Sequence, residues 1–140
     1  MNNISYEEFI KTSEYQNFIN NNPDTGTLKV FSYTAYKAMP LEGVNIEITK
    51  NIGNNKVTFF SGFTDSSGII DDIVLPAPKE EKAAVYEVLP QSTSYDLTAN
   101  LEGYLPLVYK DIPMYGGTKM IQYIKMIGDV SIKGDDSIGN

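Results

Sequence analysis

The stretch GFTDSSGIIDDI (residues 62–73) holds the residues whose types and spacing come closest to a chemical site. Asp65, Asp71 and Asp72 place three carboxylates within eight residues of the chain. Such a group could bind a divalent cation, supply an acid/base pair, or form the turn between two strands. The chain has no cysteine and no histidine, which excludes thiolate and imidazole chemistry and leaves carboxylates, lysines and tyrosines.

The spacing of this stretch favours a turn. Asp65 and Gly68 fit the first and last positions of a type I turn. Asp71 and Asp72 are adjacent, and adjacent residues of a strand point to opposite faces, so we do not expect them to join Asp65 at one ion. Calcium loops space their ligands as D-x-D-x-D-G, a pattern that is absent here. We therefore predict no metal ligand, no cofactor and no catalytic residue, and a protein that is not an enzyme; a calcium site on these aspartates is the alternative.

The chain has more acidic than basic residues, which disfavours some classes of binding partner. The net charge is −7 and the isoelectric point about 4.5, so neither nucleic acid nor an anionic membrane surface is an expected partner. No apolar run approaches the roughly 20 residues that a membrane span requires. The first residues, MNNISYEEFIK, have neither a basic start nor an apolar core, so we expect synthesis in the cytoplasm without a classical signal peptide.

Residues 1–22 carry the signals of short helices and form a predicted helical arm. Ser5 and Glu8 have the spacing of a capping box, and Ser13 with Gln16 repeats it. Helical turns this short are marginal alone, so their apolar faces must dock on the domain itself or on a partner. The candidate partner-binding residues on these faces are Tyr6, Phe9, Ile10, Phe18 and Ile19.

From residue 27 onward apolar and polar residues alternate, which is typical of β-strands. The expected strands cover residues 28–35, 44–49, 57–64, 69–75, 94–101, 104–112 and 118–127. Short strands separated by turn signals predict a mainly β fold, specifically a seven-stranded Greek-key β-sandwich with a short N-terminal helical arm. The predicted parts are an arm and linker at 1–25, the sandwich at 26–127, and a flexible tail or linker at 128–140.

Three segments carry a resemblance to a known fold. They are GTLKVFSYTAYKAMPLEGVNIEI (26–48), FTDSSGII (63–70) and YDLTANLEGYLP (95–106). Their order resembles the prealbumin-like, or carboxypeptidase-regulatory-like, β-sandwich domains, where a G-V-x-I-x-I strand, a T-D-x-x-G turn and a Y-x-L-x-A strand with a G-Y turn follow one another. The resemblance implies the fold and says little about activity, because this fold hosts many functions.

A narrower resemblance implies a biological setting. YEEFI (6–10), IVLPAP (73–78) and IQYIKMI (121–127) resemble small domains of spore-forming bacteria, among them the N-terminal domains of spore cortex-lytic enzymes. There the domain is an accessory or targeting module, which implies a spore-associated or surface assembly. Related adhesion sandwiches carry a lysine–asparagine isopeptide crosslink. Lys29 has the position of that lysine, but Ala99 stands where the acid belongs, so we expect no crosslink.

These observations predict a non-enzymatic accessory or structural interaction module. It would bind a protein partner, or itself, through the arm and through the proline-bracketed loop at 76–94, which contains the candidate contact Tyr86. The alternative is a carbohydrate-binding module for peptidoglycan or another glycan, in which Tyr104, Tyr109 and Tyr115 stack on sugar rings.

Overall fold

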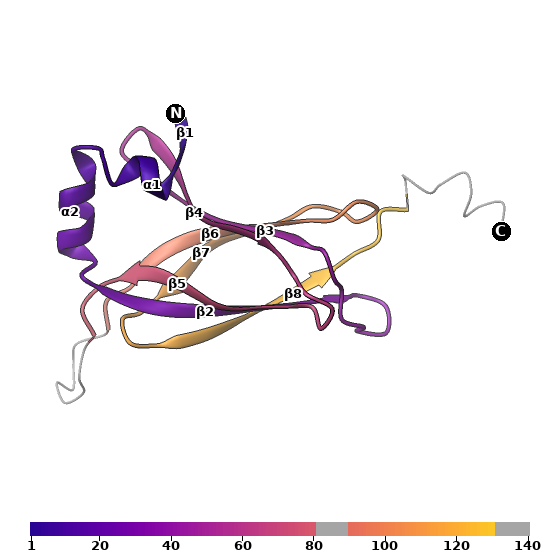
Figure 1. Ribbon diagram of the computed structural model, residues 1–140. Helices are drawn as coiled ribbons and strands as arrows, with labels where there is room; N and C mark the ends of the chain where they lie inside the picture. The colour runs from indigo at the N-terminus through magenta and orange to yellow at the C-terminus, as the bar shows by residue number, and fades with distance from the viewer. Residues whose placement is uncertain (81–89, 131–140) are drawn as a thin grey trace.

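The computed structural model of the chain describes residues 1–80 and 90–130, which form two β-sheets and a short helical arm (Figure 1). The strands are β1 (Asn2–Ser5), β2 (Asp24–Thr34), β3 (Asn45–Ile52), β4 (Asn55–Phe63), β5 (Ile69–Ala77), β6 (Thr93–Asn100), β7 (Leu107–Met114) and β8 (Lys119–Met126). The helices are α1 (Tyr6–Phe9) and α2 (Glu14–Asn21). The predicted mainly β fold with a helical arm is confirmed. No helix in the described part of the chain is long and apolar enough to cross a membrane.

The two sheets are both mixed. One has five strands in the order β1-β4-β3-β6-β7, and the other has three in the order β5-β2-β8. β1 runs parallel to β4, and β8 runs parallel to β2, whereas the other pairs are antiparallel. Figure 1 shows the sheets packed face to face, with α1 and α2 at one end of the sandwich.

Alternation along the strands builds the core between the sheets. Leu28 and Val30 of β2 and Ile46 and Ile48 of β3 are buried, while the residues between them are exposed or half-buried. Burying one such side chain stabilises the fold by about 1.5–3 kcal/mol. The same alternation continues along β6, within the predicted strand 94–101, where Tyr95, Leu97 and Ala99 are all buried.

The first strand corrects the prediction that residues 1–22 are helical throughout. Asn2 to Ser5 pair with β4, whose edge offers free backbone groups, and Ser5 then begins α1. Ser5 can do both because its backbone is extended, which suits a strand end and a helix N-cap equally. The first capping box is confirmed: Glu8 N–H donates to Ser5 Oγ at 3.1 Å, and Ser5 N–H donates to Glu8 Oε1 at 2.9 Å.

The second predicted capping box is wrong. Ser13 already has helical backbone angles and makes no side-chain bond to the helix, whereas an N-cap residue needs an extended backbone. Gln16 instead donates from Nε2 to Asn20 Oδ1, one turn further along α2, at 2.9 Å. The two residues have the spacing of a capping box, but the helical backbone at Ser13 prevents the cap bond from forming.

The acidic stretch forms the expected turn between β4 and β5. Asp65 Oδ1 accepts the N–H groups of Ser67 and Ile69 at 2.9 Å each, and Asp65 O accepts that of Gly68 at 2.8 Å. Gly68 has φ of 77°, and a Cβ there would lie 2.4 Å from Ser32 O. The turn therefore needs both Asp65 and Gly68, for reasons of geometry alone.

Asp71 and Asp72 do not point to opposite faces, which corrects the strand-alternation argument. The register between β2 and β5 shifts, so that both aspartates lie opposite Lys29 in a bulge, and Asp72 has φ of 55°. Lys119 Nζ lies 3.3 Å from Asp71 Oδ1 and 3.9 Å from Asp72 Oδ1. A bulge re-aims a side chain, and here it brings both carboxylates to the same lysine.

Candidate functional site

The arm holds its aromatic side chains against its own sandwich. Phe9 and Phe18 are 0% and 6% exposed and pack on Val57 of β4. The ring centroid of Phe9 lies 5.9 Å from that of Tyr15 and 5.6 Å from that of Phe18, both edge-on. We call this group the arm cluster; its members are Ile4, Tyr6, Phe9, Tyr15, Phe18, Ile52, Val57 and Phe59.

Phe59 joins the arm cluster to the core of the sandwich. Its ring centroid lies 4.8 Å from Tyr6, 5.7 Å from Phe18 and 5.1 Å from Tyr95 of β6. Burial raises the pKa of Tyr95, and its hydroxyl donates to Pro76 O at 2.5 Å. Burial, followed by the neighbouring Tyr15, raises the pKa of Tyr6 to about 12. The arm is thus packed as part of the domain.

The candidate residues of the arm divide into two groups. Tyr6, Phe9 and Phe18 belong to the arm cluster and face inward. Ile10 is 43% exposed, and Ile19 is half-buried outside the cluster. Of these candidates, Ile10 therefore offers the largest apolar surface to a partner.

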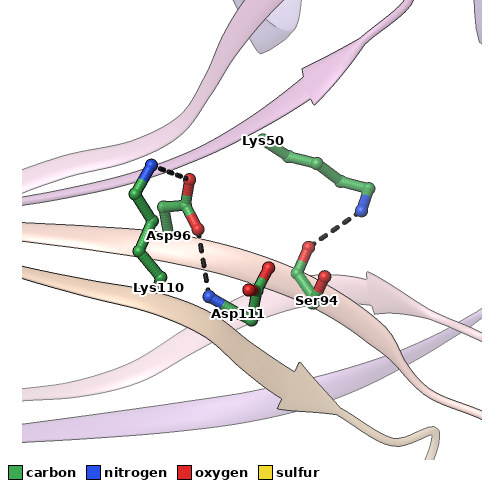
Figure 2. Close-up of polar contacts among 5 residues, drawn as sticks. All are labelled: Lys50, Ser94, Asp96, Lys110 and Asp111. Carbon is green, nitrogen blue, oxygen red and sulfur yellow. Dashed lines mark hydrogen bonds and ion pairs between the residues drawn. The ribbon is translucent and has the colours of Figure 1, made fainter.

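Charged side chains gather beside Lys50, at the end of the sandwich near the arm (Figure 2). Lys50 Nζ donates to Ser94 O at 2.8 Å and lies 5.6 Å from the centre of the Tyr95 ring. Burial lowers the pKa of Lys50, and the charges of Asp96 and Asp111 partly oppose that shift. This geometry holds a half-buried ammonium group in the wall of a small cleft of about 140 Å³.

The two aspartates beside Lys50 are fixed by a bulge. The register between β6 and β7 shifts after Tyr95, and Asp111 has φ of 57°. Asp96 Oδ1 accepts the Asp111 N–H at 3.0 Å, and Asp96 Oδ2 lies 3.5 Å from Lys110 Nζ. These contacts shape the backbone. In residues 1–80 and 90–130, no three Asp or Glu side chains are grouped to hold a metal ion.

A larger cleft lies between α2 and the hairpin of β3 and β4. It has a volume of about 470 Å³ and shares Lys50 and Asn51 with the small cleft. Four asparagines line it together with Phe18 and Ile52; they are Asn17, Asn21, Asn22 and Asn51. The amide of Asn22 already donates to Phe18 O and accepts from the Thr93 hydroxyl, so it is not available to a ligand. Lys50 and Glu14 bring opposite charges to the same wall, which favours a neutral ligand over a charged one.

Aromatic side chains also gather on the solvent side of the three-stranded sheet. Phe31 and Tyr33 of β2 stack with ring centroids 5.7 Å apart, and Tyr123 of β8 meets Phe31 edge-on at 6.1 Å. Ile121 and Tyr123 are 50% and 57% exposed. We call this group the outer patch; its members are Phe31, Tyr33, Ile121 and Tyr123. No segment of the described chain covers it as the arm covers β4.

The tyrosines predicted for sugar stacking do not form one platform. Tyr104 and Tyr109 are half-buried and pack against the core, and Tyr115 lines a separate cleft beside Gly116. Tyr86 of the predicted binding loop lies outside the described residues, as do residues 131–140 of the predicted tail.

The residues weighed for an isopeptide crosslink lie on different sheets. Lys29 is in β2 and pairs with Ile121, whereas Ala99 is in β6, buried and paired with Ile46. Lys29 faces solvent beside Asp71, whose lowered pKa comes mainly from the Asp72 N–H bond.

Comparison with known proteins gives a fold and no family. Neither a family model nor a curated protein matches the chain. The chain is similar to the structure of the Bacillus anthracis TIE protein, with 20% identity and a TM-score of 0.51 over 75% of this chain and 17% of that one. At this identity the likeness shows a shared fold alone.

Two dioxygenase structures show weaker likeness. Catechol 1,2-dioxygenase from Acinetobacter has 11% identity and a TM-score of 0.48, over 92% of this chain and 58% of that one. 3-Chlorocatechol 1,2-dioxygenase from Rhodococcus opacus has 11% identity and a TM-score of 0.45, over 76% and 61%. The chain spans less than two thirds of each of these proteins.

Sequence reasoning missed the outer patch. Its signal was present, because Phe31 and Tyr33, and likewise Ile121 and Tyr123, are spaced two apart, as residues on one strand face are. Alternation alone does not say which face is inward. The parallel pairing of β2 with β8, which places Phe31 beside Tyr123, was also needed.

Proposed function

We propose that the chain is a non-enzymatic interaction module that binds a protein partner through the outer patch. The observation that carries the proposal is the exposure of Ile121 and Tyr123, at 50% and 57%, next to the stacked rings of Phe31 and Tyr33. Apolar groups gathered in one exposed patch mark interaction sites, whereas single exposed groups are ordinary. Aromatic rings give large contact area with little loss of side-chain freedom.

The contacts of the arm support placing the partner-binding surface on the outer patch instead of on the arm. Phe9 and Phe18, which would have been its strongest anchors, are already buried against Val57 and Phe59. Using them for a partner would require undocking the arm, at the cost of their burial. The outer patch needs no such rearrangement.

The proposal also includes the biological setting of the protein and the topology of its sandwich. The resemblance of residues 6–10, 73–78 and 121–127 to accessory domains of spore-forming bacteria supports a spore-associated or surface assembly. The strand order supports a prealbumin-like Greek key: without β1, the sheets are β4-β3-β6-β7 and β5-β2-β8, the seven predicted strands in two layers.

Capture from an extract of the source cells tests the proposed surface. The bait proteins are the wild type, the double variant Ile121→Ser/Tyr123→Ser, and the control Val108→Ser, whose residue is 58% exposed on the other sheet. We expect a protein that the wild type and the control retain and that the double variant loses. Identical capture by all three baits, or no specific capture, would contradict the proposal.

Glycan binding is a second candidate, and the cleft beside α2 favours it over the predicted tyrosines. Asn17, Asn21 and Asn51 line a space of about 470 Å³ together with Phe18 and Ile52, and amides pair well with sugar hydroxyls. Cosedimentation with purified peptidoglycan tests it. Retention of the wild type, lost in Asn17→Ala/Asn51→Ala and kept in Tyr104→Ala, would support the cleft. A wild type that stays in the supernatant removes the candidate.

A further inference from the structure

We propose that the partner contributes an extended peptide segment, acidic at both ends, which adds a strand to the free edge of β8. The inference rests on the proposed function, because it names the kind of partner that the outer patch would bind. β8 is the outermost strand of its sheet, and within the described residues it pairs with β2 alone. An unpaired edge offers a row of N–H and C=O groups to another chain.

The outward peptide groups of β8 follow from bonds on its inner side. Thr27 N–H donates to Thr118 O at 2.9 Å, and Ala35 N–H donates to Met126 O at 2.8 Å. Even-numbered residues therefore face β2, and because successive peptide groups of a strand point to opposite sides, odd-numbered residues face away. The residues with outward peptide groups are Lys119, Ile121, Tyr123 and Lys125.

Just beyond the end of β8, another segment of the same chain pairs with the continuation of this edge. Leu105 N–H donates to Ile127 O at 2.8 Å, so residues 103–105 add to the edge in the antiparallel sense. Gln122 Nε2 donates to Tyr123 O at 3.2 Å, so a side chain of β8 itself occupies one outward carbonyl, and an added strand would replace this bond. From Ile127 back to Lys119 the same edge has no partner strand within the described residues.

The other sheet edges carry features that discourage strand addition. β1 has only four residues, β5 has a bulge and Pro76, and β7 has a bulge and Pro113. Short length, bulges and prolines are the usual means of protecting an edge. β8 pairs eight consecutive residues with β2 without a register shift and contains neither proline nor glycine. It is the regular edge of the described chain.

The charges on β8 select the chemistry of the added strand. Lys119 and Lys125 stand at the two ends of the outward row, with Ile121 and Tyr123 between them. An added strand of about seven residues would place apolar side chains beside the middle pair and its end residues beside the lysines. Lys119 already lies 3.3 Å from Asp71, whereas Lys125 makes no ion pair within the described residues, so Lys125 should attract the acidic end more strongly.

A second copy of the chain fits this edge poorly. Antiparallel pairing of β8 with itself, centred on Gln122, would set Lys119 opposite Lys125 twice, and like charges directly opposite are destabilising. Each copy also carries a net charge of −7, which opposes association at low salt. An acidic segment of another protein removes the first conflict.

The probe is a synthetic peptide of sequence ETVTVTE with blocked ends, whose valines would lie beside Ile121 and Tyr123 and whose glutamates would lie beside the two lysines. It is titrated into the full chain and followed by amide chemical shifts. Two control peptides are KTVTVTK and a form of ETVTVTE that is N-methylated on alternate residues of the pairing edge. We expect shifts confined to 119–125, affinity for the acidic peptide at least about tenfold above that for the lysine peptide, and no binding of the methylated form.

Variants of the protein test the same contacts. Ile121→Pro removes an outward N–H that has no partner in the described chain, so we expect the fold to persist and binding to be lost. Lys125→Glu should reverse the peptide preference, whereas Lys56→Glu, at an exposed lysine of β4, changes the net charge equally and should preserve it. If Ile121→Pro fails to fold, the methylated peptide gives the same test.

Several outcomes would overturn strand addition. These are no shifts at millimolar acidic peptide, shifts outside β8, or equal binding of the methylated and parent peptides. A dimer in sedimentation velocity that Ile121→Pro abolishes would assign the edge to a second copy instead. A captured protein that Ile121→Ser/Tyr123→Ser loses but Ile121→Pro retains would refute strand addition and leave the proposed function standing. No patch-dependent capture would refute both.

Discussion

The arm cluster and the outer patch contain similar rings in opposite situations. Phe9, which belongs to the arm, is fully buried against β4 of the same chain, whereas Tyr123 is 57% exposed on a face that no described segment covers. The difference does not lie in hydrophobicity. It lies in how the chain is connected. The helices α1 and α2 lie between β1, which pairs with β4, and β2, so both ends of the helical segment are joined to the sandwich. An apolar surface without such a connected cover is available to another molecule.

Truncating one ring in each region should show the largest contrast. Phe9→Ala should lower the free energy of unfolding by about 3–5 kcal/mol, because it leaves a cavity among Tyr15, Phe18 and Val57. Tyr123→Ala should change it by no more than about 0.5 kcal/mol. Urea unfolding monitored by circular dichroism measures both. Equal losses in the two variants would show that the outer patch is part of the core.

Removing one helix cap should have a smaller effect, confined to the arm. Ser5→Ala should cost about 1 kcal/mol, because the Glu8 N–H loses its acceptor, Ser5 Oγ, while the backbone N–H of residue 5 can still donate to Glu8 Oε1. Ser13→Ala is the matched control and should cost less than about 0.5 kcal/mol, since Ser13 makes no cap bond. The same unfolding assay compares them, and similar losses for the two serines would count against an arm anchored at Ser5.

The pH dependence of the arm cluster is the smallest effect expected. The pKa of Tyr6 is raised from 10.0 to about 12 in the folded protein, so its contribution to stability is complete below pH 10 and is lost as the pH rises through about 12. Because Tyr6 is partly exposed, we expect a loss on the order of 1 kcal/mol or less.

Comparison with Tyr6→Phe isolates that titration. The variant cannot ionise at this position, so its stability should fall less than that of the wild type between about pH 10 and 12. Burial, the larger cause of the raised pKa of Tyr95, acts in both proteins, whereas the smaller contribution of the Tyr6 charge is absent from the variant. Parallel curves for the two proteins would mean that the Tyr6 hydroxyl is not desolvated in the arm cluster.

The sheets were predictable from the sequence because alternation is a local signal. The buried set in residues 94–101 and the Asp65–Gly68 turn follow from spacing and turn chemistry within a few residues. The bulge at Asp71 and Asp72 was not predictable in this way, because it depends on how β5 meets Lys29 of β2. The strand at residues 2–5 was missed for the same reason, since it exists only where the edge of β4 receives it.

The candidate sites were harder to predict than the fold. The carboxylates closest in sequence belong to a turn and a bulge, while Lys50, Asp96 and Asp111 come together from three strands. The outer patch likewise depends on the parallel neighbours Phe31 and Tyr123, which are distant in sequence. Spacing within one segment carries no information about such pairs.

The parallel pairing of β8 with β2 also bears on how the protein folds. Thr27 pairs with Lys119, so the three-stranded sheet closes only after nearly the whole described chain is available. Contacts so distant in sequence form slowly, because the entropy of the intervening loop is lost before they are gained. We expect β8 to be the last strand to gain amide protection in pulse-labelled hydrogen exchange, and early protection of β8 would refute this. A partner strand at the free edge of β8 would therefore find its site only after this last pairing has formed.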